Sequence, residues 1–534
     1  SSRGELVRNI DEVAIVRHEC DGSGRVLSTR FFDPSDSLSP SRDGYAELRS
    51  AYDDKGFLAS ESFFDARGNP AYAPGGYHRV RYVRDDTGFA KRTEFFDADE
   101  KPAFSRDGFA RSEVDLSDEG RTFDVSYFGA DGAPVLSANG WARVKVMMDA
   151  RGKMIETRGT DADSNPQIGV DGFAAVRFDY DERENLIATT WLGEDGKPVD
   201  IPRTGAARNQ YKYDEKGNLV ETATYNAENK LAPGADGVAV VRTDFDDSGF
   251  ETRTAYFDEN NQPVLSRDGY AAIEYEYDDF GFRSREVYAG VDGKPVVSRR
   301  GYASLTMKND ARGNLLGVAQ FGVDGKPALD EQGAAETRWT LNERGLTLEI
   351  ANFGGDGKPA VVKDQYSKMV RVLDDRGWPT SISFLGPDGK PMVNKDAVAR
   401  IDYAYDERGN TARESFFDAE GKATISVKGY SSVIRVFDER DRATSQTYLD
   451  TESKPALSVD GYARMTSKYD SRGRLVEETY LDADNAAAWT ADGFSRIRHT
   501  YDPRGNRVET GYLGADEKPS YNRDGYCNAR FEHD

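Results

Sequence analysis

The six residues "YDERGN" at Tyr405 to Asn410 decide the fold of this chain, because close variants of them return along most of its length. The variants include "YDEKGN" from Tyr213, "YDDFGF" from Tyr277, "YDSRGR" from Tyr469 and "YDPRGN" from Tyr501. Self-similarity at a fixed spacing is the sequence signature of a tandem-repeat protein.

The repeat is 32 residues long. A glycine followed by an aromatic or small residue stands at positions 44, 76, 108, 140 and 172, and again from 205 to 333 and from 429 to 525 in the same steps. One extra residue separates the first two series, and at Gln365 and Ala397 the glycine is lost while the phase holds. Because the chain starts and stops within a copy, we expect it to be part of a longer array. The expected organisation is a partial and first divergent copy in 1–43, repeats in 44–198, the insertion in 199–204, repeats in 205–332, degenerate repeats in 333–428, and repeats with an incomplete last copy in 429–534.

Each copy carries three turn signals: D-x-x-G as in Asp53 to Gly56, D-G-K-P as in Asp292 to Pro295, and D-G-Y as in Asp268 to Tyr270. Asp bonds its own backbone in a turn, and Gly accepts the positive φ that ends a type I turn and starts a bulge. We therefore predict positive φ at Gly409 and Gly473. Such turns join antiparallel strands into hairpins.

Between the turns, apolar residues alternate with polar ones, which indicates strands. In the first strand of a copy, the positions equivalent to Ala46 are almost all small and those of Tyr405 are mostly aromatic, so we expect these columns to be buried on one face. The second strand ends with two apolar columns, those of Phe63 and Phe64, which need cover on both faces. We expect the short apolar segment after the second turn, such as Val264-Leu265, to supply it.

The sequence therefore predicts an all-β fold: about sixteen tandem 32-residue β-hairpin repeats that form an elongated or curled antiparallel sheet. The alternative is a parallel β-solenoid with one copy per coil. About 32 strands at ~4.8 Å would span on the order of 150 Å along a flat path, and a solenoid about half of that.

The hairpin motif resembles the YD repeats of the Rhs family, through Tyr213-Asp214 with Gly217, Tyr405-Asp406 with Gly409, and Tyr501-Asp502 with Gly505. The resemblance covers nearly the whole chain but only at this hairpin, and typical YD repeats are shorter. It implies strands that spiral into a hollow shell in exported or surface polymorphic toxins, and YD repeats have also been linked to carbohydrate binding.

Composition excludes several classes of function. A formal net charge of −23 opposes binding to nucleic acid or to anionic lipid. No apolar run reaches the ~18 to 20 residues of a membrane helix, so we expect no direct membrane insertion. Two cysteines, Cys20 and Cys527, exclude a disulfide framework. The four histidines, His18, His78, His499 and His533, are too scattered to form a catalytic site, so we expect no enzyme activity and no catalytic residues.

Two columns are candidate binding features. Rows of second-turn carboxylates could bind Ca²⁺, yet Asp and Gly are also what the turn requires, so we expect no cofactor and favour turn chemistry. The aromatic column at the end of the second strand could instead form a ladder on which sugars stack, or it could be core. Its members are Phe63, Phe95, Tyr127, Trp191, Tyr256, Tyr288, Phe384, Phe416, Tyr448, Tyr480 and Tyr512.

Three functional hypotheses remain. The first is a non-enzymatic bacterial scaffold or assembly protein that acts through protein–protein contacts and is exported, at the cell surface or in the periplasm. The second is a glycan-binding repeat protein that uses the aromatic column. The third is an Rhs-like shell around a separate toxin.

Overall fold

The computed structural model describes residues 13–33, 36–117, 120–438, 440–470, 472–502 and 505–531. In these ranges the chain forms 33 β-strands and no α-helix, which confirms the all-β prediction. His533, Gly4 and the other residues of the two chain ends lie outside the described ranges. The strands are β1 Ile15–Cys20, β2 Val26–Phe32, β3 Glu47–Tyr52, β4 Leu58–Phe64, β5 Arg79–Arg84, β6 Ala90–Phe96, β7 Arg111–Ser117, β8 Thr122–Phe128, β9 Arg143–Met148, β10 Met154–Thr160, β11 Ala175–Tyr180, β12 Leu186–Leu192, β13 Arg208–Tyr213, β14 Leu219–Tyr225, β15 Val240–Phe245, β16 Glu251–Phe257, β17 Ala272–Tyr277, β18 Arg283–Ala289, β19 Ser304–Asn309, β20 Leu315–Phe321, β21 Glu336–Leu341, β22 Thr347–Phe353, β23 Lys368–Leu373, β24 Pro379–Leu385, β25 Arg400–Tyr405, β26 Thr411–Phe417, β27 Ser432–Phe437, β28 Ala443–Leu449, β29 Arg464–Tyr469, β30 Leu475–Leu481, β31 Arg496–Tyr501, β32 Arg507–Leu513 and β33 Asn528–Arg530.

From β2 to β32, each strand pairs antiparallel with the strand before it and the strand after it, so the hairpins join edge to edge into one sheet. Within a hairpin the pairing is long: Glu47 to Tyr52 face Phe64 to Leu58, with a bulge next to the turn. Between hairpins only three residues of β4 pair with β5. The antiparallel prediction is confirmed, and the parallel solenoid is wrong.

The pairing between hairpins is short because the segment after the second turn folds back onto the end of the second strand. The Ala71 N–H donates to the Phe63 carbonyl over 2.9 Å, and the Phe63 N–H donates to the His78 carbonyl over 3.0 Å. Phe64 and Pro70 form a single antiparallel bridge, and the equivalent bridge recurs in the other copies. The predicted return segment is therefore present as an isolated bridge and not as a third strand.

The "YDERGN" turn has the predicted chemistry. One carboxylate oxygen of Asp406 accepts the N–H groups of Arg408 at 3.0 Å and Asn410 at 2.9 Å, and the other accepts the Asn410 side-chain amide at 3.0 Å. The N–H of Gly409 donates to the Asp406 carbonyl, and Gly409 has a φ of 98°. Gly473 has a φ of 84°. The prediction of positive φ at both glycines is confirmed.

The tyrosine of this motif fastens each hairpin to the one before it. The hydroxyl of Tyr405 donates to the carbonyl of Pro379 over 2.8 Å, and its ring lies 5.1 Å from the ring of Trp378. Tyr52, Tyr180, Tyr213, Tyr277, Tyr469 and Tyr501 make the same backward bond. Tyr405 is only half-buried, which corrects the expectation of a fully buried inner face. It lies at the end of the strand, where one residue of the preceding turn covers one side of the ring.

We expect the hydroxyl and the ring of Tyr405 to contribute separately to stability. Tyr405→Phe removes one hydrogen bond and should cost about 1 kcal/mol. Tyr405→Ala also removes the packing against Trp378 and should cost about 2–4 kcal/mol, below the value for a fully buried ring. Urea unfolding of both variants checks this, and equal losses in the two would show that the ring packing contributes nothing.

The first strand carries a column of small residues that are completely enclosed. Ala174, Ala207 and Ala463 have no exposed surface, and Ser367 and Ser495 are buried at the equivalent positions. His78 is the one large member of this column and is also buried, with its Nδ1 3.1 Å from the Ala71 carbonyl. The small side chains let the return segment lie directly over the strand.

Departures from the repeat pattern leave the sheet intact. The turn between Ile201 and Ala206 contains one residue more than the equivalent turn from Ser41 to Tyr45. Gln365 and Ala397 replace the usual glycine and adopt its conformation, with φ of 65° and 63°. Both keep the turn hydrogen bond to the residue three positions earlier, so the degenerate copies preserve the register.

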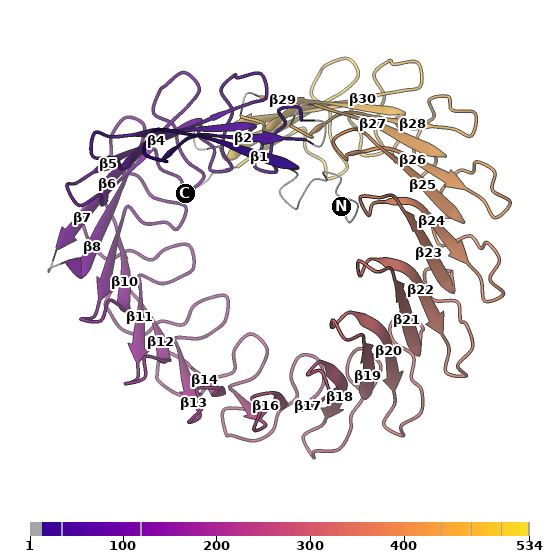
Figure 1. Cartoon of the computed structure of the whole chain (residues 1–534), viewed down its shortest axis with the longest axis horizontal. Helices are drawn as coiled ribbons and strands as arrows, with labels where there is room; N and C mark the ends of the chain where they lie inside the picture. The colour runs from indigo at the N-terminus through magenta and orange to yellow at the C-terminus, as the bar shows by residue number, and fades with distance from the viewer. Residues whose placement is uncertain are drawn as a thin grey trace.

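The sheet curls into a ring (Figure 1). From β1 the strands follow one another round the ring until β29 and β30 return to the part occupied by β2 and β4. Long open sheets curl because every strand adds its right-handed twist to the last. From β4 to β29 the path is on the order of 120 Å long, which corresponds to a ring about 40 Å across between backbones.

Candidate interaction surfaces

The predicted aromatic column lies inside the sheet's apolar layer. Seven of its members, Phe63, Phe95, Tyr288, Phe384, Phe416, Tyr448 and Tyr480, are buried. The other four, Tyr127, Trp191, Tyr256 and Tyr512, are half-buried. The rings are therefore arranged as core and do not form an exposed stacking surface. Sugar binding by this column stays a prediction that the burial does not favour.

A second aromatic column interleaves with the first. The aromatic residue of the Gly-aromatic pair lies between successive members, so that Tyr430 is 5.7 Å from Phe416 and 4.3 Å from Tyr448. The contacts continue through Tyr462, Tyr480, Phe494 and Tyr512 to Tyr526 at the end of the sheet. A similar run joins Phe31 to Tyr127 through Tyr45, Phe63, Tyr77, Phe95 and Phe109. Each ring thus stabilises two neighbouring hairpins.

In one hairpin the first aromatic column has a glycine, Gly159, and the second column has its largest ring there, Trp141. A side chain at Gly159 would overlap the Trp141 ring, which occupies that space and donates from Nε1 to the Gln167 carbonyl at 2.9 Å. The large Trp141 ring fills the space that Gly159 leaves, so the apolar layer stays packed across this hairpin.

The two interleaved aromatic columns form a ladder of rings, and we expect the tyrosines of this ladder to make the fold sensitive to alkali. Burial raises the pKa of Tyr45 and of Tyr430 to about 12, against ~10 in an unfolded chain. Because these phenols hold their protons more tightly when folded, their contribution is complete below about pH 10 and is lost as the pH rises through 12. Tyrosinate absorbance and the circular dichroism of the sheet should therefore change together in this range. Full ionisation with an unchanged sheet signal would contradict the buried ladder.

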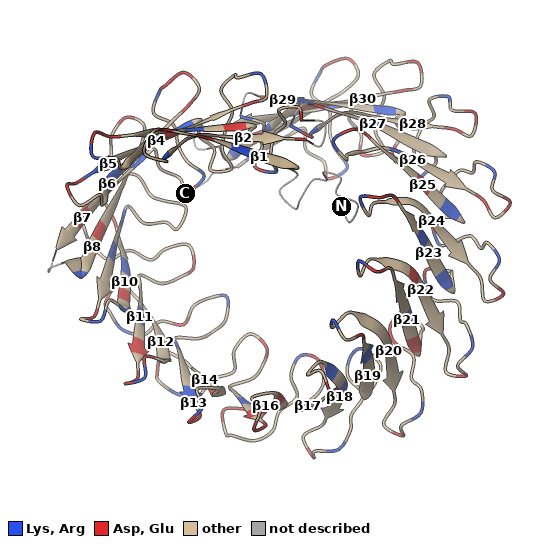
Figure 2. Cartoon of the chain, viewed as in Figure 1, with Lys and Arg blue, Asp and Glu red and all other residues tan. Residues whose placement is uncertain are grey.

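The opposite face of the sheet is charged. Arg guanidinium groups cover the Phe64 column, as Arg49 does at 3.8 Å from the Phe64 ring centre. Glu47 is buried between Arg30 and Arg49; burial alone would raise its pKa, but the hydrogen bonds from the two arginines lower it. Both signs of charge alternate round the ring (Figure 2). Arginine side chains thus supply cover for the Phe64 column, which had been expected from the return segment.

The second-turn carboxylates serve their turns. Asp292, Asp324 and Asp356 each accept the N–H two residues on and lie 3.3–3.8 Å from the lysine of the same turn. Within the described ranges no group of three or more His, Cys, Asp or Glu side chains could hold a metal ion. His18 and His499 each bond a threonine of the paired strand.

The two ends of the array meet along a seam. Each hairpin has a tip, the turn between its two strands, and a base, the two turns and the return segment that lead to the next hairpin. At the seam the tips of β25 to β32 lie against the bases that follow β2, β4 and β6. The Arg472 guanidinium lies 5.9 Å from the centre of the Tyr72 ring.

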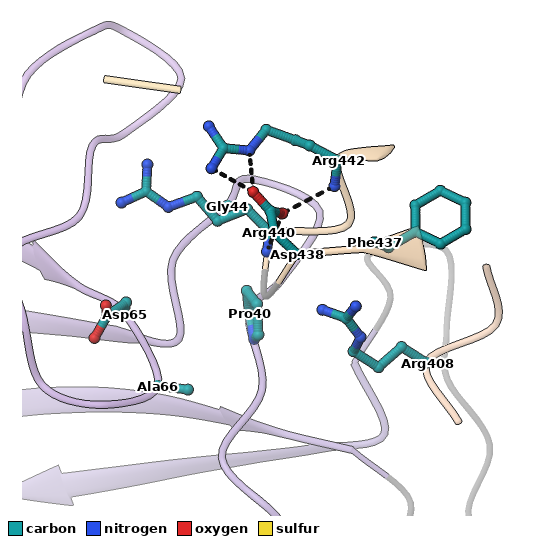
Figure 3. A pocket seen from close by; sticks show the side chains of 9 residues that line it. All are labelled: Pro40, Gly44, Asp65, Ala66, Arg408, Phe437, Asp438, Arg440 and Arg442. Carbon is teal, nitrogen blue, oxygen red and sulfur yellow. Dashed lines mark hydrogen bonds and ion pairs between the residues drawn. The ribbon is translucent and has the colours of Figure 1, made fainter. Parts of the chain in front are cut away.

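Three pockets of about 420, 500 and 520 Å³ lie along the seam, each lined by residues from both sides. The first is lined by Pro40, Gly44, Asp65 and Ala66 from the bases, and by Arg408, Phe437, Asp438, Arg440 and Arg442 from the tips (Figure 3). Within it Arg442 is held by Asp438 over 2.8 Å and stacks on the Tyr469 ring. The seam brings together residues that are more than 300 positions apart in the sequence.

One column of the base is apolar in fifteen of its sixteen copies, with Asp200 as the exception, and changes its exposure round the ring. This return column contains the residue two positions after the proline bridge. Its first three members, Pro40, Tyr72 and Phe104, are buried or half-buried and line the seam pockets. Ten later members are exposed by 42–69%: Ile168, Leu265, Val297, Leu329, Val361, Val393, Ile425, Leu457, Trp489 and Tyr521.

Sequence reasoning missed both the seam and the return column. The seam gives no local sequence signal, since it depends on how far the sheet curls. The return column did have one: a regularly spaced apolar residue beside the buried position of Ala71. The alternation rule assigns both residues of this segment to cover of the second strand, which hides the exposed one.

In the described part of the chain no helix is long and apolar enough to cross a membrane.

No family model matches the sequence, and no curated protein matches it. Solved structures do resemble it. The crystal structure of TcdB2-TccC3-TEV matches with a TM-score of 0.43 and 12% identity over 95% of this chain and 24% of that one. The crystal structure of TcdB2-TccC3 has a TM-score of 0.33 and 13% identity over 97% and 29%. A Tc holotoxin pore from Photorhabdus luminescens has a TM-score of 0.30 and 13% identity over 92% and 26%. This chain thus spans about a quarter of the length of these three solved chains.

Proposed function

We propose that this protein is a wall-forming scaffold: a non-enzymatic β-hairpin array that curls around a central space and acts through protein–protein contacts in a larger assembly. The observation that carries the proposal is the seam. Tips of the last hairpins rest on bases of the first ones, as Arg472 rests on Tyr72, so the sheet winds as a spiral and its second turn begins to stack on its first.

The construction of the ring supports a structural role. The hydroxyl of each motif tyrosine reaches the preceding hairpin, and each ladder ring touches two hairpins. The motif tyrosines and the ladder rings thus hold neighbouring hairpins together. The aromatic column that glycan binding would need is buried or half-buried, so the scaffold is the better supported of these two hypotheses.

The finer form of the proposal follows from the YD-like hairpins. In an Rhs-like setting the wall would surround a separate toxin, and the protein would be exported by a bacterium. A ring that begins a second turn has the geometry such a shell requires.

Two measurements on the natural protein test the proposal. Analytical ultracentrifugation should find it in an assembly larger than one chain, and screens with hydrolase and transferase substrates should find no turnover. A monomer that turns over a substrate, with the activity abolished by one substitution within the array, would overturn it.

A further inference from the structure

Nine consecutive hairpins present an apolar side chain to solvent at the same place. They run from Leu265 to Tyr521 in the return column, with Val361 42%, Ile425 47% and Trp489 53% exposed. Isolated exposed apolar residues are ordinary, but a continuous row along one edge of a protein marks a contact surface.

The seam shows what covers this column. In the first hairpins the equivalent residues Pro40, Tyr72 and Phe104 line the seam pockets, and the residues across the pockets belong to hairpin tips. The contact at Tyr72 is made by Arg472, the third residue of a D-x-R-G turn. A planar guanidinium on an aliphatic stem can pack flat on an apolar surface while its edge stays hydrated.

We propose that the exposed return column is a docking edge for the hairpin tips of a second copy of this chain. The inference rests on the proposed wall function and names the partner of that wall. The hairpin tips of the second copy would lie on the return column of this copy, in the same way as the C-terminal tips lie on the N-terminal bases at the seam.

The chain carries the complementary surface as well. Tips outside the seam carry a cation at the position of Arg472 that pairs with a nearby carboxylate and still stays more than half exposed. The side chains of Arg151, Lys216 and Arg312 are 59%, 54% and 60% exposed and lie 3.5–3.9 Å from Glu184, Asp247 and Asp310. Tips and bases share the same 32-residue repeat and the same ring, so a row of tips meets a row of bases in register. Nine hairpins with two or three contacting residues each give about 20–30 residues a side, the size of a stable interface.

Tip and base are different surfaces, so the contact is heterologous. After two copies have joined, a free base row remains on one and a free tip row on the other, and the assembly can continue. The proposal therefore predicts stacks that grow with concentration, in contrast to a dimer that closes on itself.

The test uses three variants of the full chain in sedimentation velocity. The base variant is Val361→Asp/Val393→Asp/Ile425→Asp. The tip variant is Arg151→Glu/Lys216→Glu. The matched control is Val372→Asp/Val436→Asp, which changes valines that are 57% and 54% exposed on the charged face. Circular dichroism establishes that each variant retains the sheet.

Wild type and control should form species beyond the dimer as concentration rises, and the base and tip variants should each associate at least tenfold more weakly. An equal mixture of base and tip variants should form a dimer and nothing larger, because each supplies the one surface the other lacks. A wild type that stays monomeric up to its solubility limit, a dimer that never grows, a monomeric mixture, or a control as defective as the base variant would each overturn the proposal. Scattering from the monomer reports the ring separately, so a failed docking edge is distinguishable from a failed wall.

Discussion

Gly409→Val should destabilise the protein by about 2–6 kcal/mol. Two costs combine at this position. Gly409 has a φ of 98°, where a β-branched residue is strained by about 1–3 kcal/mol. A Cβ there would also overlap the ring of Trp378, and overpacking of this kind costs a further ~1–3 kcal/mol. Urea unfolding and amide hydrogen exchange in the flanking hairpins measure the loss, since repeat arrays can open locally.

Gly217 is the matched control, because it occupies the same place in its hairpin with a φ of 91° and has nothing within 4 Å of an added Cβ. Gly217→Val should therefore cost only the ~1–3 kcal/mol of backbone strain. Glu184 and Asp441 occupy this place in other hairpins with φ of 68° and 59°, so other residues can be accommodated there. Equal losses at Gly409 and Gly217 would contradict the overlap with Trp378.

Tyr448→Ala should cost about 3–5 kcal/mol and weaken two hairpins at once. The Tyr448 side chain is 6% exposed and lies between Tyr430 at 4.3 Å and Tyr462 at 5.5 Å. Its removal leaves a gap in the apolar layer and breaks two ring contacts.

The ladder itself provides the control for Tyr448. Tyr526 is the last ring, is 40% exposed and touches only Tyr512 among the described rings. Tyr526→Ala should cost less than about 1 kcal/mol. Hydrogen exchange should accelerate on both sides of residue 448 in the first variant. A loss confined to one hairpin would show that the ladder does not couple neighbours.

The hairpin could be predicted from sequence because its determinants are local. Asp406, Gly409 and Asn410 complete their turn within five residues, and the same letters in other copies give the same turn. Antiparallel winding followed from the turn type. The sequence does not decide whether the aromatic column is core or binding surface. Its burial depends on the second column of rings, which in the sequence stands only next to the glycine of a turn.

The ring could not be predicted in the same way. Its curvature is the sum of a small rotation at every strand, and no single residue specifies it. The contact between Tyr72 and Arg472 depends on that sum, so it leaves no periodic pattern in the sequence. The half-burial of Tyr405 was missed for a related reason. The alternation of apolar and polar residues shows which face of the strand Tyr405 lies on, but it does not show how much of the ring the preceding turn covers.

Small-angle X-ray scattering of the monomer, extrapolated to zero concentration, tests the curled sheet most directly. A ring about 40 Å across, with strands and turns added, should give a largest dimension below about 90 Å and a radius of gyration slightly above the ~24 Å of a compact globule of this length. An uncurled sheet of the same strands would give a largest dimension near ~150 Å and a radius of gyration near ~45 Å, and that result would contradict the ring, the seam and the wall.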